Sequence, residues 1–269
     1  RGCVVIDNSS AFRAEGDCPL IVPEVNARAL VTLPPGGAII ANPNCSAIIL
    51  LVAIEPLRRA FGIERVNVAT YQAASGAGAR AMDELTSQTR EVLAGRPAVP
   101  RIFSEPYAFN LFSHNTPVDP LSGQNVEEQK VVSESARLWS TSGVEGPLPR
   151  VTATCIRVPV LRAHSQAVTL TLRTPASEAQ VRRALADAAG VRVVDDRAGN
   201  AFPTPLKASG GDDVLVGRIR PDLSQTEDGT LRPGAPARGW HLFIAGDQLR
   251  KGAALNAVQI AEALMNSSR

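Results

Sequence analysis

Residues 38–61, AIIANPNCSAIILLVAIEPLRRAF, decide the fold class of this chain. The short apolar run 38–41 has the length and composition of a buried strand, and the Asn-Pro-Asn of residues 42–44 is typical of a turn. From Ser46 onward the apolar residues recur at helical spacing until a basic tail and Gly62 end the run. A strand, a turn and an apolar helix in this order form the repeating unit of α/β proteins, so we expect an α/β layer here.

Outward from this unit the periodicity predicts further strands and helices. A run of strands with few helices follows residue 150, which indicates an α+β block in the middle of the chain beside α/β edges. Residues 95–125 are proline-rich and irregular, and residues 228–239 have the composition of a hairpin-like loop. The predicted strands are 4–6, 66–71, 151–159 and 165–173, with others near Val191, Val214 and His241, and the predicted helices are 77–93, 126–139, 178–189 and 251–265.

The composition excludes several classes of function. With 269 residues, 44% apolar and 20% charged, the chain can bury a sizeable core of the ordinary globular kind. A net charge of +2 and the lack of a Lys/Arg block give no footprint for nucleic acid. The longest apolar run, 47–54, is too short to cross a bilayer. The four cysteines have neither metal-ligand nor disulfide-framework spacing, which predicts no metal site and a reducing compartment.

Cys45 stands at the junction of the turn and the helix. A cysteine at a helix N-terminus lies near the positive end of the helix dipole and near free N–H groups, which lower the pKa of the thiol. A thiolate at that place would suit nucleophilic chemistry. A small buried cysteine before a helix fits the position equally well, so the position alone leaves both interpretations open.

A cysteine nucleophile needs a base, and the chain has three histidines. His164 follows Arg157 across a Pro-containing bend between two predicted strands, so both side chains can converge on one pocket. Taken alone, this pattern is more often a loop histidine near a surface arginine. His114 in a polar loop and His241 at the start of a strand are more often structural than catalytic.

The glycine-rich segment 71–80, YQAASGAGAR, follows a predicted strand and opens a predicted helix. Backbone N–H groups of such a turn can hold a phosphate or a nicotinamide amide. Gly-rich strand-to-helix turns are common, so the segment is weak evidence alone. Glu127 and Lys130 lie on one face of a predicted helix, which usually indicates only a solvated ion pair.

Taken together, these segments resemble the aspartate-semialdehyde dehydrogenase family, most closely its plant-like and bacterial branch. The shared motifs occur in the family's order along essentially the whole chain, and a set of this size does not arise by chance. They are VIDNSSAFR (5–13), PEVN (23–26), NPNCS (42–46), YQAASGAG (71–78), EEQK (127–130), CIRVPVLRAH (155–164) and GDQLRKGAALN (246–256).

The resemblance implies roles for particular residues. Cys45 would be the acyl-thioester nucleophile, His164 the general acid/base, and Gln72 the residue that orients the substrate. Arg157 would bind the substrate carboxylate, and Glu127 its amino group. The other implied roles are phosphate binding by Arg13 and Lys130, shaping of the phosphate or oxyanion site by Asn44, and cofactor contacts by Ser75, Gly76, Gln248 and Asn256.

The implied reaction is the NADPH-dependent reduction of β-aspartyl phosphate to aspartate β-semialdehyde and phosphate. It belongs to the biosynthesis of lysine through diaminopimelate, and of threonine, methionine and isoleucine. The substrate carries a phosphate, a carboxylate and an ammonium group, which two basic residues, one arginine and one glutamate match charge for charge. The resemblance also implies a homodimer or homotetramer, no nucleic-acid or membrane partner, and a location in the bacterial cytoplasm or the plastid stroma.

The family begins with a dinucleotide-binding half whose Gly-rich turn holds the pyrophosphate, and no such turn precedes Cys3. We therefore expect the front of that domain to be missing here. The implied fold is a remnant of a Rossmann-like NADP-binding domain, residues 1–44 and 250–269, with a larger domain at 45–249. This larger catalytic and dimerisation domain would have a mixed sheet of the glyceraldehyde-3-phosphate-dehydrogenase-like type.

Three other functions compete with this interpretation. An N-acetyl-glutamyl-phosphate reductase shares the fold and the Cys/His chemistry, but an acetylated nitrogen needs no carboxylate partner such as Glu127. A non-catalytic homologue that acts as a dimer-forming protein would usually lose the nucleophile or the base, and this chain keeps both. A cysteine hydrolase would need an Asp or Asn to orient the base, and none is evident.

Overall fold

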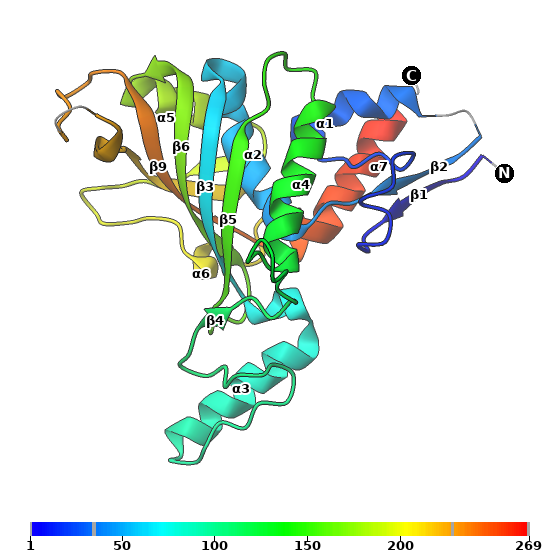
Figure 1. Cartoon of the computed structure of the whole chain (residues 1–269), viewed down its shortest axis with the longest axis vertical. Coiled ribbons are helices and arrows are strands. Elements are labelled where there is room, and N and C mark those ends of the chain that lie inside the picture. The colour runs from blue at the N-terminus through cyan, green and yellow to red at the C-terminus, as the bar shows by residue number, and fades with distance from the viewer. Residues whose placement is uncertain (1, 34–35, 227–228, 268–269) are drawn as a thin grey trace.

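Within residues 2–33, 36–226 and 229–267, which the computed structural model describes, the chain forms two β-sheets beside a long buried helix (Figure 1). In the small sheet, β1 (Val4–Asp7) pairs in parallel with β2 (Ala38–Ala41). The large sheet has the strand order β4-β5-β3-β6-β9-β8-β7. Its strands are β3 (Ile63–Gln72), β4 (Phe112–Ser113), β5 (Arg150–Arg157), β6 (His164–Ala176), β7 (Val191–Val193), β8 (Val214–Pro221) and β9 (Ala237–Gly246).

The large sheet is mixed. Strand β3 runs parallel to β5 and antiparallel to β6, while β7 and β8 form a second parallel pair at the far edge. The remaining pairs, β4 with β5, β6 with β9 and β8 with β9, are antiparallel. The predicted combination of an α/β edge and an α+β block with a mixed sheet is therefore confirmed.

Three of the helices pack together against the large sheet, and the last helix of the chain reaches back to the small one. Helix α7 packs on the small sheet, where Ile260 meets Ile21 and Ile40 in a separate apolar cluster. The C-terminal segment thus joins the N-terminal one. The helices are α1 (Pro23–Asn26), α2 (Cys45–Phe61), α3 (Ala79–Leu93), α4 (Val126–Ser140), α5 (Glu178–Ala186), α6 (Pro205–Ala208) and α7 (Leu255–Ser267).

Helix α2 is the centre of the core. Residues 48–51 along it have no exposed surface, and the helix contacts β6, β8 and β9 as well as α4 and α5. Burying each such Leu or Ile side chain stabilises the fold by about 1.5–3 kcal/mol. Cys45, the first residue of this helix, is partly exposed although the residues on both sides of it are buried.

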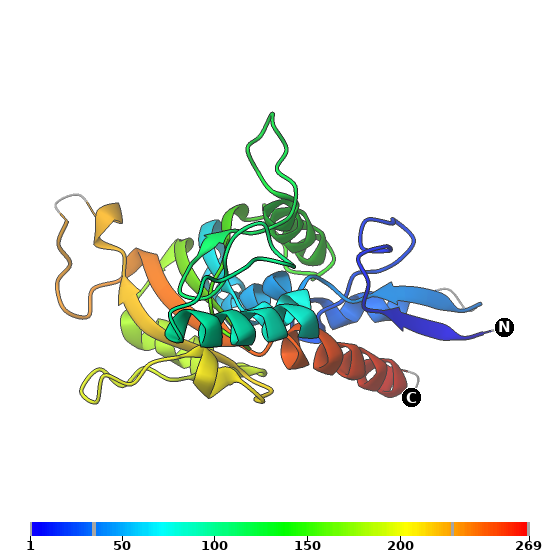
Figure 2. The same cartoon turned by 90° about the horizontal axis from the view of Figure 1, so that it is seen from below.

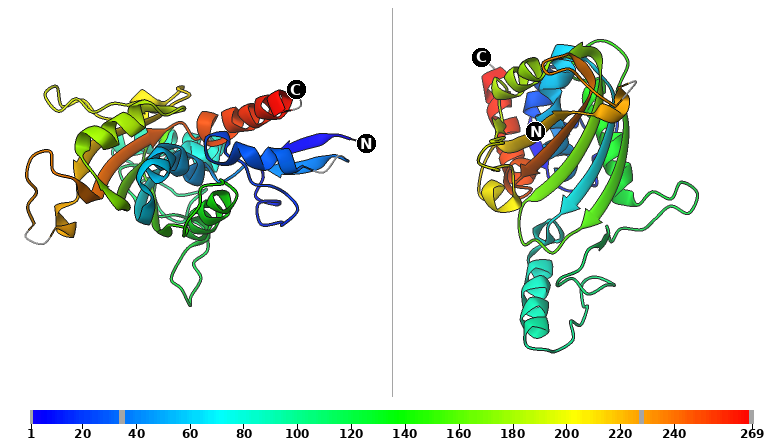
Figure 3. Two further views of the ribbon diagram at one scale, coloured as in Figure 1. Left: turned by 90° about the horizontal axis from the view of Figure 1, so that it is seen from above. Right: turned by 90° about the vertical axis from the view of Figure 1, so that its left-hand side faces the viewer.

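The strands alternate between a buried face and a more open one. In β3, Val66 and Val68 are buried, while Arg65 and Asn67, which alternate with them, are exposed. The right panel of Figure 3 shows these strands face-on. Helix α3 projects from the end of β3 as an arm, in front of the sheets in the view of Figure 2.

Several predicted boundaries are wrong by a few residues. Helix α3 starts at Ala79 because residues 74–77 form a 3₁₀ turn and Gly78 takes a φ of 92°. The predicted helix 251–265 begins instead as a π-helical turn, Arg250–Ala254. Helix α6 has no counterpart in the prediction. The predicted loop 228–239 lies partly outside the described residues, and β9 already begins at Ala237.

In the part of the chain that the structure describes, no helix has the length and apolar character needed to span a membrane.

Candidate active site

A cavity of about 460 Å³ lies where α2 begins and where β3 and β5 end. Because these two strands are parallel and in register, Gln72 and Arg157 at their carboxyl ends are paired residues. The N-terminal part of α4 forms another wall. The cavity brings together ten of the predicted site residues: Arg13, Asn44, Cys45, Gln72, Ser75, Gly76, Glu127, Lys130, Arg157 and Gln248.

Cys45 is the first residue of α2 and is partly exposed to the cavity. Burial first, and the carboxylate of Glu127 second, raise the pKa of its thiol to about 12. The positive charge of Arg13, a hydrogen bond with Ser46 and the positive charge of Arg157 each lower this pKa by a smaller amount. In this state of the cavity, the thiol is therefore protonated.

This direction corrects the predicted lowering of the thiol pKa at the helix start. The side chain of Asn44 caps α2, and its Oδ1 accepts hydrogen bonds from the backbone N–H groups of Ser46 (2.9 Å) and Ala47 (3.2 Å). These N–H groups are among the donors expected to favour a thiolate. Since Asn44 already occupies them, burial and Glu127 dominate.

Glu127 is the centre of the polar cluster around the sulfur. Its Oε1 accepts from Asn44 Nδ2 at 2.8 Å and from Gln72 Nε2 at 3.2 Å, and the residue is almost completely buried. Gln72 Nε2 also donates to Ser46 Oγ at 2.9 Å. Lys130 Nζ lies 3.8 Å from Glu127 Oε2. The cluster thus joins α2, β3 and α4 around one carboxylate, and the pair 127/130 is part of the cavity rather than a solvated surface pair.

His164, the first residue of β6, is completely buried and does not line the cavity itself. Its Nδ1 accepts a hydrogen bond from the backbone N–H of Ala73 at 3.1 Å, so the proton of the neutral ring is on Nε2. That Nε2 has no hydrogen-bond partner among the described residues. Burial, with Arg157 nearby, lowers the pKa of His164 well below its ordinary value. The described ring is therefore a neutral N–H donor.

The His164 ring lies directly behind Gly76. A Cβ added at Gly76 would be 2.9 Å from Cε1 and 3.0 Å from Nε2 of this ring. Only glycine leaves room there, so one residue separates the unpartnered Nε2 from the cavity. The described structure has no hydrogen bond between His164 and Cys45, whose predicted cooperation remains a prediction.

Arg157 is held firmly on one side of its guanidinium. Nη1 donates to the carbonyl oxygen of Ala73 at 2.9 Å, and Nη2 contacts His114 Nε2 at 2.7 Å and Asn115 Oδ1 at 3.1 Å. Its Nε is buried, and no partner for it occurs in the described part of the chain. Ala73 therefore bonds both His164 and Arg157 through its own backbone.

Two site residues were not predicted from the sequence. His114 lies in the cavity wall against Arg157, although its polar loop suggested a structural residue. Glu134 accepts from the backbone N–H of Asn44 at 2.5 Å and lies 3.5 Å from Arg13 Nη1. Its position on α4, two turns after Glu127 and on the same face, was the available signal.

The predicted cofactor residues divide into two groups. Gln248 accepts from Ala163 N through Oε1 and donates to Ser75 Oγ, so these two residues form one side of the cavity. Asn256 is completely buried, and its amide donates to Ile21 O at 3.0 Å and to Asn42 Oδ1 at 2.6 Å. Asn256 is not among the residues that line the cavity, and its amide holds the turn behind it, so its contact with a cofactor remains a prediction.

Small residues form much of the wall beside the sulfur. It includes Gly76, Ala77, Gly252 and Ala253, which are small, together with Leu249. A Cβ added at Gly252 would lie 3.1 Å from Cys45 Cβ. A wall of small residues with the unpartnered His164 Nε2 behind it fits a nicotinamide near the sulfur.

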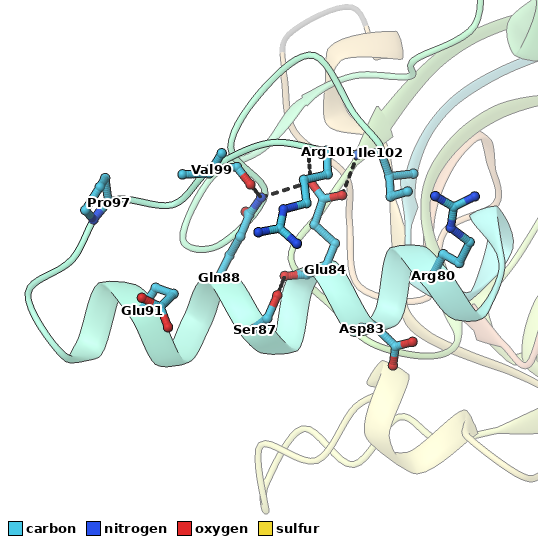
Figure 4. A pocket seen from close by; sticks show the side chains of 10 residues that line it. All are labelled: Arg80, Asp83, Glu84, Ser87, Gln88, Glu91, Pro97, Val99, Arg101 and Ile102. Carbon is cyan, nitrogen blue, oxygen red and sulfur yellow. Dashed lines mark hydrogen bonds between the residues drawn. The ribbon is translucent and has the colours of Figure 1, made fainter.

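A second hollow, of about 510 Å³, lies along α3 (Figure 4). Glu84 and Gln88 project from the helix into it and hold the loop that follows. Glu84 accepts from the backbone N–H groups of Arg101 and Ile102, and Gln88 donates to Val99 O. These polar groups are used in fastening the loop, so the hollow is structural despite its size.

Comparisons with known proteins show the family to which this chain belongs. The family model described as "Semialdehyde dehydrogenase, dimerisation domain" matches residues 54–251, and "Semialdehyde dehydrogenase, NAD binding domain" matches residues 1–33. The chain is 48% identical to an aspartate-semialdehyde dehydrogenase of Synechocystis over 98% of its own length and 72% of that protein, and 44% identical to one of Legionella pneumophila, covering 71% of it. The crystal structure of aspartate semialdehyde dehydrogenase II of Vibrio cholerae, complexed with ASA (aspartate semialdehyde), is similar with a TM-score of 0.86. It is 41% identical, and the match covers 97% of this chain and 72% of that one.

Proposed function

The chain belongs to the aspartate-semialdehyde dehydrogenase family, and from that premise we propose that it converts β-aspartyl phosphate to aspartate β-semialdehyde through a thioester on Cys45, with NADPH as reductant. The balanced reaction consumes β-aspartyl phosphate, NADPH and one proton, and it yields the semialdehyde, NADP⁺ and phosphate. The observation that carries the proposal is the cavity itself. It places one thiol among two basic side chains suited to a phosphate, one further arginine and one buried carboxylate.

The charges of the cavity suit the charges of the substrate. Arg157 offers its unpartnered Nε to a carboxylate, and Arg13 and Lys130 at the open side suit a phosphate. Glu127 is a buried acceptor that an ammonium group can approach. An N-acetylated substrate would bring no ammonium group to this carboxylate, which would keep only the contact with Lys130, and this disfavours an N-acetyl-glutamyl-phosphate reductase.

Substrate binding would also activate the nucleophile. Glu127 raises the pKa of Cys45, so a substrate ammonium beside Glu127 would cancel that effect. The sulfur then adds to the acyl carbon, the bond from that carbon to the phosphate oxygen breaks, and the phosphate leaves with the proton of the thiol. The product is a thioester, which separates the departure of phosphate from the reduction step.

His164 would supply a hydrogen bond in the second half of the reaction. When bound, the reduced nicotinamide supplies a hydride for the thioester carbonyl. The carbon–sulfur bond then breaks, the aldehyde is released and the thiolate of Cys45 is regenerated. His164 presents Nε2–H, and the Ala73 N–H bond to Nδ1 keeps the ring in that tautomer. The geometry favours His164 as a donor to the reacting oxygen or sulfur.

The cofactor and assembly extend the proposal. The NAD-binding family match at residues 1–33 and the small-residue wall beside Cys45 support a nicotinamide cofactor. The choice of NADP over NAD rests on the family resemblance. The dimerisation-domain match supports an oligomer, which we propose to be a homodimer or a homotetramer. The place in lysine, threonine, methionine and isoleucine biosynthesis follows from the proposed reaction.

The test is phosphate-dependent formation of NADPH from aspartate β-semialdehyde. The chain would be assayed alone and completed with the part of the Synechocystis relative that it does not span, each with Cys45→Ala. Cys3→Ala is the matched control, because Cys3 is exposed and lies outside the cavity. We expect activity that requires phosphate, disappears in Cys45→Ala and survives in Cys3→Ala. Silence from both folded forms, or equal activity on N-acetyl-glutamate semialdehyde, would refute the proposal.

A further inference from the structure

The loop that carries His114 touches the cavity from behind Arg157. His114 is nearly buried, at 8% exposure, and its Nε2 lies 2.7 Å from Arg157 Nη2. The neighbouring Asn115 accepts from the same Nη2 at 3.1 Å. Neither the family motifs nor the reaction described above gives this histidine a part.

The contact fixes the tautomer of His114. A guanidinium can only donate, so Nε2 must be the acceptor and the ring proton must sit on Nδ1. Nδ1 lies 3.3 Å from Thr116 Oγ1, which suits a hydrogen bond donated by this N–H. A ring protonated on both nitrogens would instead place an N–H against the guanidinium. His114 thus supports Arg157 only as a neutral acceptor.

Thr116 continues the connection to the opposite wall of the cavity. Its Oγ1 also accepts the backbone N–H of Glu127 at 3.2 Å, in the first turn of α4. A chain of hydrogen bonds therefore runs from the guanidinium of Arg157 through His114 and Thr116 to the residue that bears the buried carboxylate. This series of hydrogen bonds connects the residue suited to a carboxylate with the residue suited to an ammonium group.

The same contacts leave Arg157 with one side free. Ala73, His114 and Asn115 accept from Nη1 and Nη2, while the buried Nε has no partner in the described residues. A long arginine side chain loses much conformational freedom when its guanidinium is held in one plane. Fixing this plane before the ligand arrives lowers the cost of binding a planar carboxylate.

We propose that His114 is a positioning residue that sets the guanidinium of Arg157 for the α-carboxylate of the substrate and, through Thr116, fixes its separation from Glu127. This inference rests on the proposed function for the identity of the substrate. It makes His114 a determinant of selectivity for an α-amino-acid end, through Arg157 rather than through contact with the reacting atoms.

The test compares His114→Ala with His114→Gln, because the Oε1 of Gln can replace Nε2 as an acceptor. We expect His114→Ala to raise the KM for aspartate β-semialdehyde about tenfold with little change in kcat, and His114→Gln to stay within about threefold of the parent. His241→Gln is the matched control on the distant strand β9. With 3-aminopropanal, which lacks the carboxylate, kcat/KM should be equal in all variants.

A binding measurement separates this inference from the proposed function. In a Cys45→Ala background, calorimetry with aspartate β-semialdehyde reports affinity without chemistry. A loss of affinity with His114→Ala that His114→Gln restores supports the inference even if no turnover occurs. Unchanged affinity, or an equal loss of kcat/KM on 3-aminopropanal, would overturn it and leave His114 a merely structural residue.

Discussion

Two buried polar clusters of this molecule look alike but are used differently. One surrounds Glu84 on the α3 arm and the other surrounds Glu127 in the active-site cavity, and the adjoining hollows have similar volumes of about 510 and 460 Å³. Each is centred on a nearly buried glutamate with a glutamine beside it. Size and composition therefore do not distinguish them, but their hydrogen bonds do.

In the α3 cluster the side chains bond the backbone. Gln88 Oε1 accepts from the N–H groups of Tyr107 and Ala108, and Gln88 Nε2 donates to Glu84 and to Val99 O. Glu84 accepts two further backbone N–H groups from the same loop. Each side chain supplies hydrogen-bond partners that the backbone of the loop would otherwise lack, so these polar groups have a structural role.

In the active-site cluster the side chains mostly form hydrogen bonds with one another, and some of their donors have no acceptor. His164 Nε2 and Arg157 Nε are buried without partners in the described part of the chain; the His164 ring lies behind Gly76 in the cavity wall, and Arg157 lines the cavity. An unpartnered buried donor costs about 1–3 kcal/mol. A fold retains that cost where a ligand will supply the missing acceptor, so the unsatisfied cluster identifies the site better than the larger hollow does.

The largest expected effect tests the unsatisfied cluster. Arg157→Lys keeps the charge but loses the planar guanidinium and its contacts with His114 and Asn115. We expect kcat/KM for aspartate β-semialdehyde to fall about 100-fold, equivalent to about 2.7 kcal/mol, because a carboxylate matches a guanidinium better than an ammonium. Arg150→Lys at the other, exposed end of β5 is the control. An activity loss below about threefold would mean that Arg157 is structural.

The next effect tests the satisfied cluster. Glu84→Ala leaves the backbone N–H groups of Arg101 and Ile102 without their acceptor. We expect the free energy of unfolding in urea to fall by about 2–4 kcal/mol, with kcat/KM of the folded protein unchanged within about twofold. Asp83→Ala on the same helix, with no acceptor role described, should have little effect on either. A large loss of activity at full stability would contradict the structural assignment of this hollow.

The smallest effect concerns the charge beside the sulfur. Because Glu127 raises the pKa of Cys45, Glu127→Gln should lower that pKa and increase the thiolate fraction at every pH below it. At pH 8 we expect iodoacetamide to alkylate Cys45 about tenfold faster in Glu127→Gln than in the parent, since one pKa unit is a tenfold change in thiolate.

The alkylation is measured by mass spectrometry of the Cys45 peptide between pH 7 and 10. The rate should climb with pH in both proteins, and the two curves should be displaced along the pH axis. Glu64→Gln, which makes the same charge change at a half-exposed site on β3, should match the parent. Superimposed curves for Glu127→Gln and the parent would show that burial alone controls the thiol.

Local patterns predicted most of the elements correctly. The apolar run in residues 38–61 gave β2 and α2 within one residue, because burial and helical spacing are properties of neighbours in the chain. The site residues carried by motifs also converge on one cavity, except that His164 lies behind its wall and Asn256 behind its turn. The 3₁₀ turn before α3 and the π-helical turn before α7 were missed. Residues of both turns line the cavity, and local spacing in the sequence does not indicate such a tertiary arrangement.

The sequence by itself determined the family, the buried helix with Cys45 at its start and the set of charges that the cavity would hold. These follow from residue types and their spacing along the chain. Only the tertiary structure decided how the charges act on one another. It brought Glu127 from α4 to the sulfur and gave the helix-start N–H groups to Asn44, so the pKa of Cys45 rises instead of falling. It also placed His114 behind Arg157, 43 residues away in the chain. Electrostatic and hydrogen-bond energies depend on distances between side chains, and the fold alone sets those distances.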